Sequence, residues 1–194
     1  MRRRFFEVAM LAALAAGISV PAAAHAVDGG GGFFAGLDHP VGGLDHLLAL
    51  VTVGLWAARL GGRALWAVPG AFLAAMAAGA GVGMAGIGLV GVEPMILASL
   101  LVLGLLVALD ARPRPAPAAV LAGLFALFHG HAHGAELPSA AQPALYAAGF
   151  LTASAILLLF GIAAARVAIA ARAGLLLRLS GGVVATLGTA LMVL

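Results

Sequence analysis

The chain has 194 residues, of which 64% are hydrophobic and 9% charged, with a mean hydropathy of +1.17. A soluble globular domain carries about 25% charged residues, so this composition excludes that class and predicts a membrane protein. The absence of cysteine excludes disulfides and thiolate metal ligands. The net charge of +3 comes from arginines that flank apolar stretches, which we interpret as topology signals and not as a nucleic-acid-binding surface.

Residues 1–24 have the features of a secretory signal peptide. An arginine triplet follows Met1, an apolar run spans 8–20, and small residues come next. This pattern predicts cleavage after Ala24 or Ala26 and therefore a mature N-terminus in the periplasm. An uncleaved signal anchor is the alternative interpretation.

Six apolar stretches follow a glycine-rich leader at 27–37, each near the ~20 residues that a helix needs to cross a bilayer. We therefore predict an all-α, polytopic membrane helix bundle: a cleaved signal peptide and then one domain, 27–194, with six transmembrane helices. The predicted spans are 41–59, 65–88, 93–110, 117–134, 144–165 and 174–194.

Arginine is distributed unevenly between the segments that join these spans. All seven arginines beyond the signal lie in, or within five residues of, the segments that join the first and second, the third and fourth, and the fifth and sixth spans. Cytoplasmic segments are enriched in arginine and lysine. The expected location is thus the inner membrane of a bacterium, with both mature termini in the periplasm.

Two short motifs hold five of the six histidines. The first runs from His39 to His46 (HPVGGLDH) and the second from Phe128 to Glu136 (FHGHAHGAE). Imidazole and carboxylate groups are costly in hydrocarbon and usually functional there. In the predicted topology one motif begins the first span and the other ends the fourth. Both then lie near the outer surface at similar depth, where they can share one ion.

Helical spacing selects the candidate ligands. His129, His133 and Glu136 follow one another at i, i+4 and i+7 and share a helix face, whereas His131 lies on the opposite side. The two histidines of the first motif have the same i, i+7 spacing, and a carboxylate precedes the second. The predicted metal ligands are His39, Asp45, His46, His129, His133 and Glu136.

Other residues beside the motifs carry structural expectations. We expect the first span to begin with Asp38 as its N-cap and Pro40 in its first turn. Gly130 and Gly134 are expected to let the fourth span unwind locally. The pair Gly79-x3-Gly83 is interpreted as a helix-packing motif.

Neutral imidazoles suit nickel, cobalt, copper and zinc, and nearby carboxylates offset part of the charge of such an ion. Without thiolates the ion can be held without being trapped, as permeation requires. The sequence also contains no lysine and no phosphate-binding G-x4-G-K-[ST] motif, so the chain itself does not hydrolyse ATP.

At these residues the chain resembles the HupE/UreJ family of nickel/cobalt permeases. The family pattern is His, five residues, Asp-His in the first span, and Phe-His-Gly-x-(Ala/Val)-His-Gly-x-Glu in the fourth; both are present here, at His39 to His46 and Phe128 to Glu136. The resemblance implies transport of Ni²⁺, or of Co²⁺, as substrate, often for hydrogenase or urease maturation. It implies no enzymatic activity and no cofactor. The expected partners are the ion and the lipid bilayer, without nucleic acid, and partner proteins stay open.

Two other functions use the same residues. An intramembrane zinc-dependent hydrolase would bind zinc with histidines and use a carboxylate as base. A periplasm-facing metal sensor or store would bind the ion without moving it into the cell.

Overall fold

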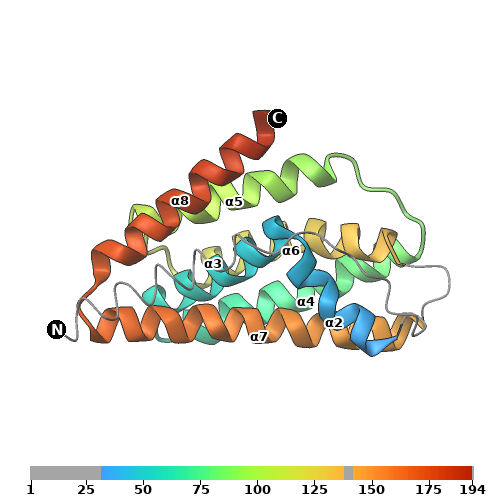
Figure 1. The fold of residues 1–194 in the computed structure, drawn as a ribbon, viewed down its shortest axis with the longest axis horizontal. Coiled ribbons are helices and arrows are strands. Elements are labelled where there is room, and N and C mark those ends of the chain that lie inside the picture. Colours follow the sequence, from blue (N-terminus) through green and yellow to red (C-terminus); the bar gives the residue numbers. More distant parts are fainter. Residues whose placement is uncertain (1–31, 138–141, 194) are drawn as a thin grey trace.

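The computed structural model describes residues 32–137 and 142–193, and the predicted signal peptide with its cleavage sites lies outside them. Within these ranges the chain forms seven α-helices and no strand (Figure 1). The helices are α2 (Phe33–Gly42), α3 (Leu44–Leu60), α4 (Ala64–Met84), α5 (Val92–Ala108), α6 (Pro115–Ala135), α7 (Pro143–Ala170) and α8 (Gly174–Val193). The prediction of an all-helical bundle is confirmed.

Helices α4, α6, α7 and α8 are each long and apolar enough to cross a membrane. Helix α5 is apolar but has 17 residues, which is short for a span. Helices α2 and α3 together have the length and composition of a fifth span, but they meet at an angle of 85°. The helices from α4 onward agree with the predicted spans to within a few residues, and the total of six membrane crossings stays a prediction.

The beginning of the first predicted span is wrong. The helix expected from residue 41 is divided at Gly43, whose backbone is extended, and the preceding helix α2 begins at Phe33. Pro40 is therefore inside α2 and Asp38 does not cap a helix. The break falls at Gly42 and Gly43, two and three residues after Pro40, and glycine and proline are the residues that least favour a helix.

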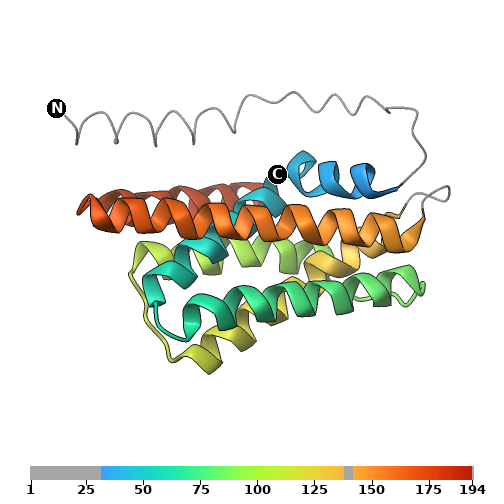
Figure 2. The ribbon, with the colours of Figure 1, turned by 90° about the horizontal axis from the view of Figure 1, so that it is seen from below.

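Three close helix pairs build the bundle: α4 with α6, α5 with α8, and α3 with α7 (Figures 1 and 2). Glycines stand where the backbones of these pairs approach. A Cβ atom at Gly54 would lie 2.2 Å from the Leu158 carbonyl oxygen, and one at Gly104 would lie 2.6 Å from the Ala185 nitrogen. Such contacts bring helices together in lipid, where burial of apolar surface gives no driving force.

The α4–α6 pair uses two glycines from each helix. A Cβ atom on any of Gly79, Gly83, Gly130 or Gly134 would lie within 2.4 Å of a carbonyl oxygen of the other helix. The packing interpretation of Gly79-x3-Gly83 is confirmed. The expectation that the other two glycines unwind the fourth span is wrong, because α6 is helical through Ala135 and its glycines face α4.

Polar contacts join α3 to the loop between α5 and α6. They lie at the end of the bundle that holds Arg59 and Arg112, which we call the arginine-rich end. Arg59 and Arg112 both form ion pairs with Asp110, and the Trp56 indole Nε1–H donates to the Ala111 carbonyl oxygen at 3.1 Å. Hydrogen bonds from Arg112 and then Arg59 lower the pKa of the Asp110 carboxyl group. These contacts hold the loop against the end of α3.

Candidate metal centre

Four imidazoles from three helices form a row at the opposite end of the bundle, which we call the histidine row: His39 of α2, His133 of α6, His46 of α3 and His129 of α6. Successive ring centroids are separated by 4.5, 4.0 and 4.6 Å. The His39 side chain is 32% exposed, whereas the other three residues are buried. The row therefore leads from solvent into the bundle.

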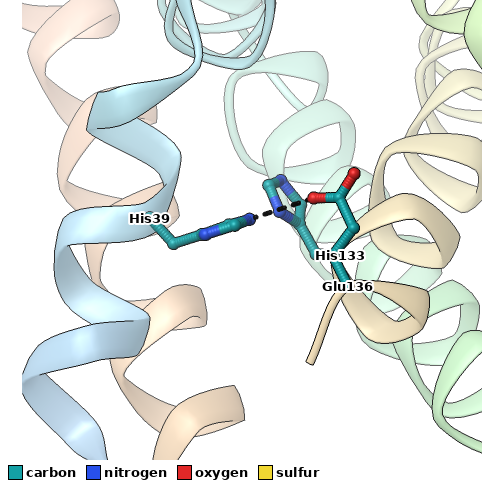
Figure 3. A group of neighbouring side chains, drawn as sticks. All are labelled: His39, His133 and Glu136. Atoms are coloured by element: carbon teal, nitrogen blue, oxygen red, sulfur yellow. Dashed lines mark ion pairs between the residues drawn. The ribbon is translucent and has the colours of Figure 1, made fainter. Parts of the chain in front are cut away.

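Glu136 stands at the exposed end of the histidine row (Figure 3). Its Oε2 atom lies 3.6 Å from His39 Nε2, and its side chain is 61% exposed. Ligand atoms of His39, His133 and Glu136 all lie within 4.8 Å of one another. Small side-chain movements would bring these three groups to the bonding distances of a metal ion, ~2.0–2.2 Å for nitrogen and oxygen ligands.

Asp45 orients the third imidazole of the row. Its Oδ1 atom accepts hydrogen bonds from the His46 backbone N–H at 2.9 Å and from the His46 ring Nδ1 at 3.0 Å. A carboxylate only accepts, so His46 carries its proton on Nδ1 and its lone pair on Nε2. In many metal sites a carboxylate accepts a hydrogen bond from the ring nitrogen of a histidine that does not bind the metal. The structure thus places Asp45 on the Nδ1 side of the His46 ring and leaves Nε2 without a hydrogen-bond partner among the described residues.

Several nitrogens of the row are buried without a partner. Both ring nitrogens of His133, and Nε2 of His46, have no hydrogen-bond partner among the described residues. Leaving a buried polar atom unpaired costs about 1–3 kcal/mol. The ring of His133 lies between those of His39 and His46, and its other neighbour is Phe150. A bound cation would satisfy the lone pair on His46 Nε2 and the one on whichever His133 nitrogen carries no proton.

His131 lies outside the histidine row. Its Nε2 atom is 2.7 Å from the carbonyl oxygen of Ile87, in the segment between α4 and α5. Since a carbonyl oxygen only accepts, this nitrogen is the donor. His131 fastens α6 to that segment.

The structure brings all six predicted ligands into one cluster, and it adds two polar neighbours that the motifs do not contain. The Ser99 hydroxyl of α5 lies 2.9 Å from His129 Nε2. The Tyr146 ring of α7 packs edge-on against His39, at 5.7 Å between centroids. Each is a polar residue in an otherwise apolar stretch, which is the one sequence signal that could have indicated it.

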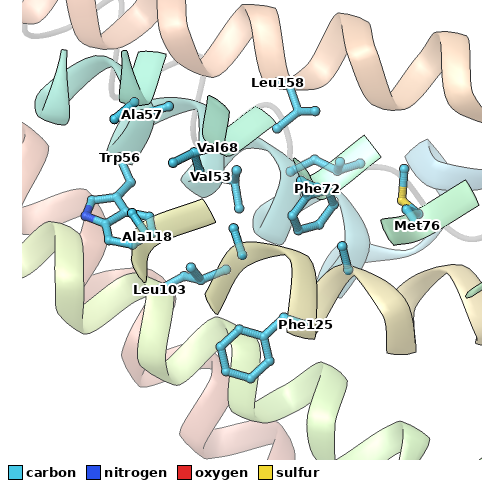
Figure 4. Close-up of a cluster of buried hydrophobic side chains, with 14 of the residues drawn as sticks. Val53, Trp56, Ala57, Val68, Phe72, Met76, Leu103, Ala118, Phe125 and Leu158 are labelled. Carbon is cyan, nitrogen blue, oxygen red and sulfur yellow. The ribbon is translucent and has the colours of Figure 1, made fainter. Parts of the chain in front are cut away.

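A cluster of buried apolar side chains (Figure 4) extends from Phe72, whose ring neighbours that of His129, to Trp56, which donates to the Ala111 carbonyl oxygen at the arginine-rich end. Trp56 of α3, Phe72 of α4, Leu103 of α5 and Phe125 of α6 are among its buried side chains. Passage of any ion through this cluster would need these helices to move apart.

Comparison with known proteins identifies the family. Residues 11–191 match the family described as HupE / UreJ protein. The chain is 46% identical over 180 residues to Protein HupE of Rhizobium leguminosarum bv. viciae, covering 92% of this chain and 94% of that protein. No solved structure matches the chain significantly. The chain therefore belongs to the HupE/UreJ family, whose members are permeases associated with nickel and cobalt uptake and are not enzymes.

Proposed function

We propose that this protein imports Ni²⁺ across the bacterial inner membrane, with Co²⁺ as the second candidate substrate. The observation that carries the proposal is the histidine row. Four imidazoles and two carboxylates lead from the exposed Glu136 to the buried His129, inside a bundle of apolar helices. Imidazole nitrogen with carboxylate oxygen suits divalent ions of the nickel and cobalt type.

The ion first binds at the exposed end, where Glu136 supplies charge and His39 and His133 supply nitrogen. His133 also neighbours His46, so it can belong to two successive sets of ligands. The second set is His133, His46 and His129, with the Asp45 carboxylate beside it. Passage between overlapping sets keeps each step short, which favours release as well as binding.

The direction of transport follows from the predicted topology, in which the histidine row faces the periplasm and the arginines face the cytoplasm. A divalent cation that enters a cell with an inside-negative potential gains about 4.6 kcal/mol per 100 mV, from ~2.3 per charge. This electrical term alone would suffice to drive uptake without ATP.

A metal sensor or store remains the competing proposal, because it would use the same ligands. Transport into proteoliposomes separates the two functions. The purified protein would be reconstituted into liposomes that enclose a nickel-sensitive dye. Valinomycin and a potassium gradient would impose an inside-negative potential. We expect Ni²⁺ influx with the natural chain and none with His46→Ala. High-affinity binding without influx would instead support a store or sensor.

A further inference from the structure

We propose that Ser99 is a positioning residue for the ion site: it fixes the tautomer of His129 so that this histidine offers Nδ1, and not Nε2, to the ion. The proposal rests on the proposed function, since it assigns a ligand atom within that site. It also brings α5, which carries neither histidine motif, into the ion-binding machinery.

The hydrogen bonds of Ser99 determine where its single proton lies. Ser99 is fully buried, and its Oγ atom lies 2.6 Å from the Ile96 carbonyl oxygen and 2.9 Å from His129 Nε2. Two oxygens at 2.6 Å need a proton between them, and a carbonyl has none to give. The hydroxyl therefore donates to Ile96 and can only accept from His129.

This hydrogen bond fixes the tautomer of His129. Its Nε2 atom must carry the proton, so the lone pair of the neutral ring is on Nδ1. His46 is held in the opposite tautomer, because Asp45 accepts from its Nδ1 and leaves Nε2 with the lone pair. The two rings stand edge to face, 4.6 Å apart at an interplanar angle of 89°. Each deep histidine thus has one nitrogen anchored and the other available.

Anchoring matters because His129 is 1% exposed and has no bulk water to fix its ring. Partners that orient metal-binding histidines typically change metal affinity by about 10- to 100-fold when removed. Ser99 gives the ring one orientation before the ion arrives. Without it, the Nε2–H group has lost its acceptor and the ring can adopt the tautomer that offers the wrong nitrogen.

Calorimetric titration of the purified full-length protein with Ni²⁺ tests this role. We expect Ser99→Ala to weaken binding by about 10- to 100-fold, and Ser99→Thr, which keeps the hydroxyl, to restore most of the affinity. Ser154→Ala is the matched control. Ser154 is also fully buried and donates to a backbone carbonyl of its own helix, that of Phe150, and among the described residues it forms no hydrogen bond with a histidine. Its variant should bind like the natural chain.

Nitrogen-15 NMR of the metal-free protein, labelled at histidine, tests the tautomer without any metal. We expect a pyrrole-type signal for Nε2 of His129 and a pyridine-type signal for Nδ1, with a mixture in Ser99→Ala. A pyridine-type Nε2 in the natural chain, or undiminished nickel affinity of Ser99→Ala, would overturn the proposal. Failure of the natural chain to bind nickel would instead overturn the proposed function, and the NMR result would still decide the tautomer.

Discussion

Replacing Gly130 with alanine should disable the ion site without touching a ligand. Gly130 lies on the face of α6 that packs against α4, between His129 and His133 in sequence. An added Cβ atom would lie 1.9 Å from the carbonyl oxygen of Met76. Because the obstacle is backbone, no side-chain rotation relieves the overlap, and α6 must move away from α4.

Helices α4 and α6 must move apart to admit the added Cβ atom. Ordinary contact begins at 3.4 Å, so the two helices must separate by about 1.5 Å at this point. Metal sites tolerate ligand displacements of only about 0.2 Å. His129 and His133 move with α6, whereas His46 stays on α3, so the shared ligand set is lost. Overpacking of this kind costs about 1–3 kcal/mol in stability, and a backbone collision belongs at the upper end.

Gly123→Ala is the matched control, since Gly123 lies two turns earlier on the same helix and faces the same partner. Its added Cβ atom would lie 3.6 Å from the nearest atoms of Ala71 and Ala75, an ordinary contact. We expect radiolabelled nickel uptake to fall about 100-fold in Gly130→Ala at equal protein in the membrane. Gly123→Ala should keep uptake and gain up to about 1 kcal/mol of helix propensity. Full uptake by Gly130→Ala would refute the packing argument, and equal loss in both variants would show that the clash distances do not matter.

Two further predictions concern the arginine-rich end and the topology. Asp110→Asn should lower stability by about 1 kcal/mol or less at neutral pH, measured as the thermal unfolding midpoint in detergent. Because the pKa of this carboxyl group is lowered in the folded state, its contribution is present above its ordinary value near 3.9 and is lost as pH falls through the folded value. The difference between the variant and the natural chain should therefore shrink below about pH 4, and an unchanged difference there would contradict the assignment to this charge. Reporter fusions near residues 62 and 113 should report the cytoplasm and one near 91 the periplasm; an external signal at 113 would remove the argument that both motifs face one side.

The sequence predicted the helices well because lipid leaves the backbone few options. A long apolar segment in a bilayer must satisfy its backbone hydrogen bonds internally, so hydropathy alone locates α4, α6, α7 and α8. Helical spacing also separated His131, which bonds to Ile87, from His129 and His133 of the histidine row. These inferences depend on local periodicity, which a single sequence contains.

Features that depend on neighbouring helices were not predictable. Glycine serves both to break helices and to pack them, so Gly130 was expected to unwind α6 although it packs against α4. The opposite error occurred at Gly43, where a helix expected to be continuous is broken, because α2 packs separately on α7 through Gly36 and Gly149. Ser99 was missed because a single serine in an apolar helix has no periodicity, and its meaning comes only from His129 of another helix.

The central claim is that nickel enters through the histidine row, and nickel uptake by cells that carry matched variants of α6 tests it most directly. His133→Gln and His131→Gln make the same change at two buried histidines two residues apart, one within the row and one outside it. Glutamine at 131 can still donate to the Ile87 carbonyl oxygen, whereas glutamine at 133 removes the imidazole shared by both ligand sets. We expect radiolabelled nickel accumulation for the natural chain and for His131→Gln, and none above background for His133→Gln at equal protein levels. Accumulation by His133→Gln equal to that of the natural chain would contradict the central claim.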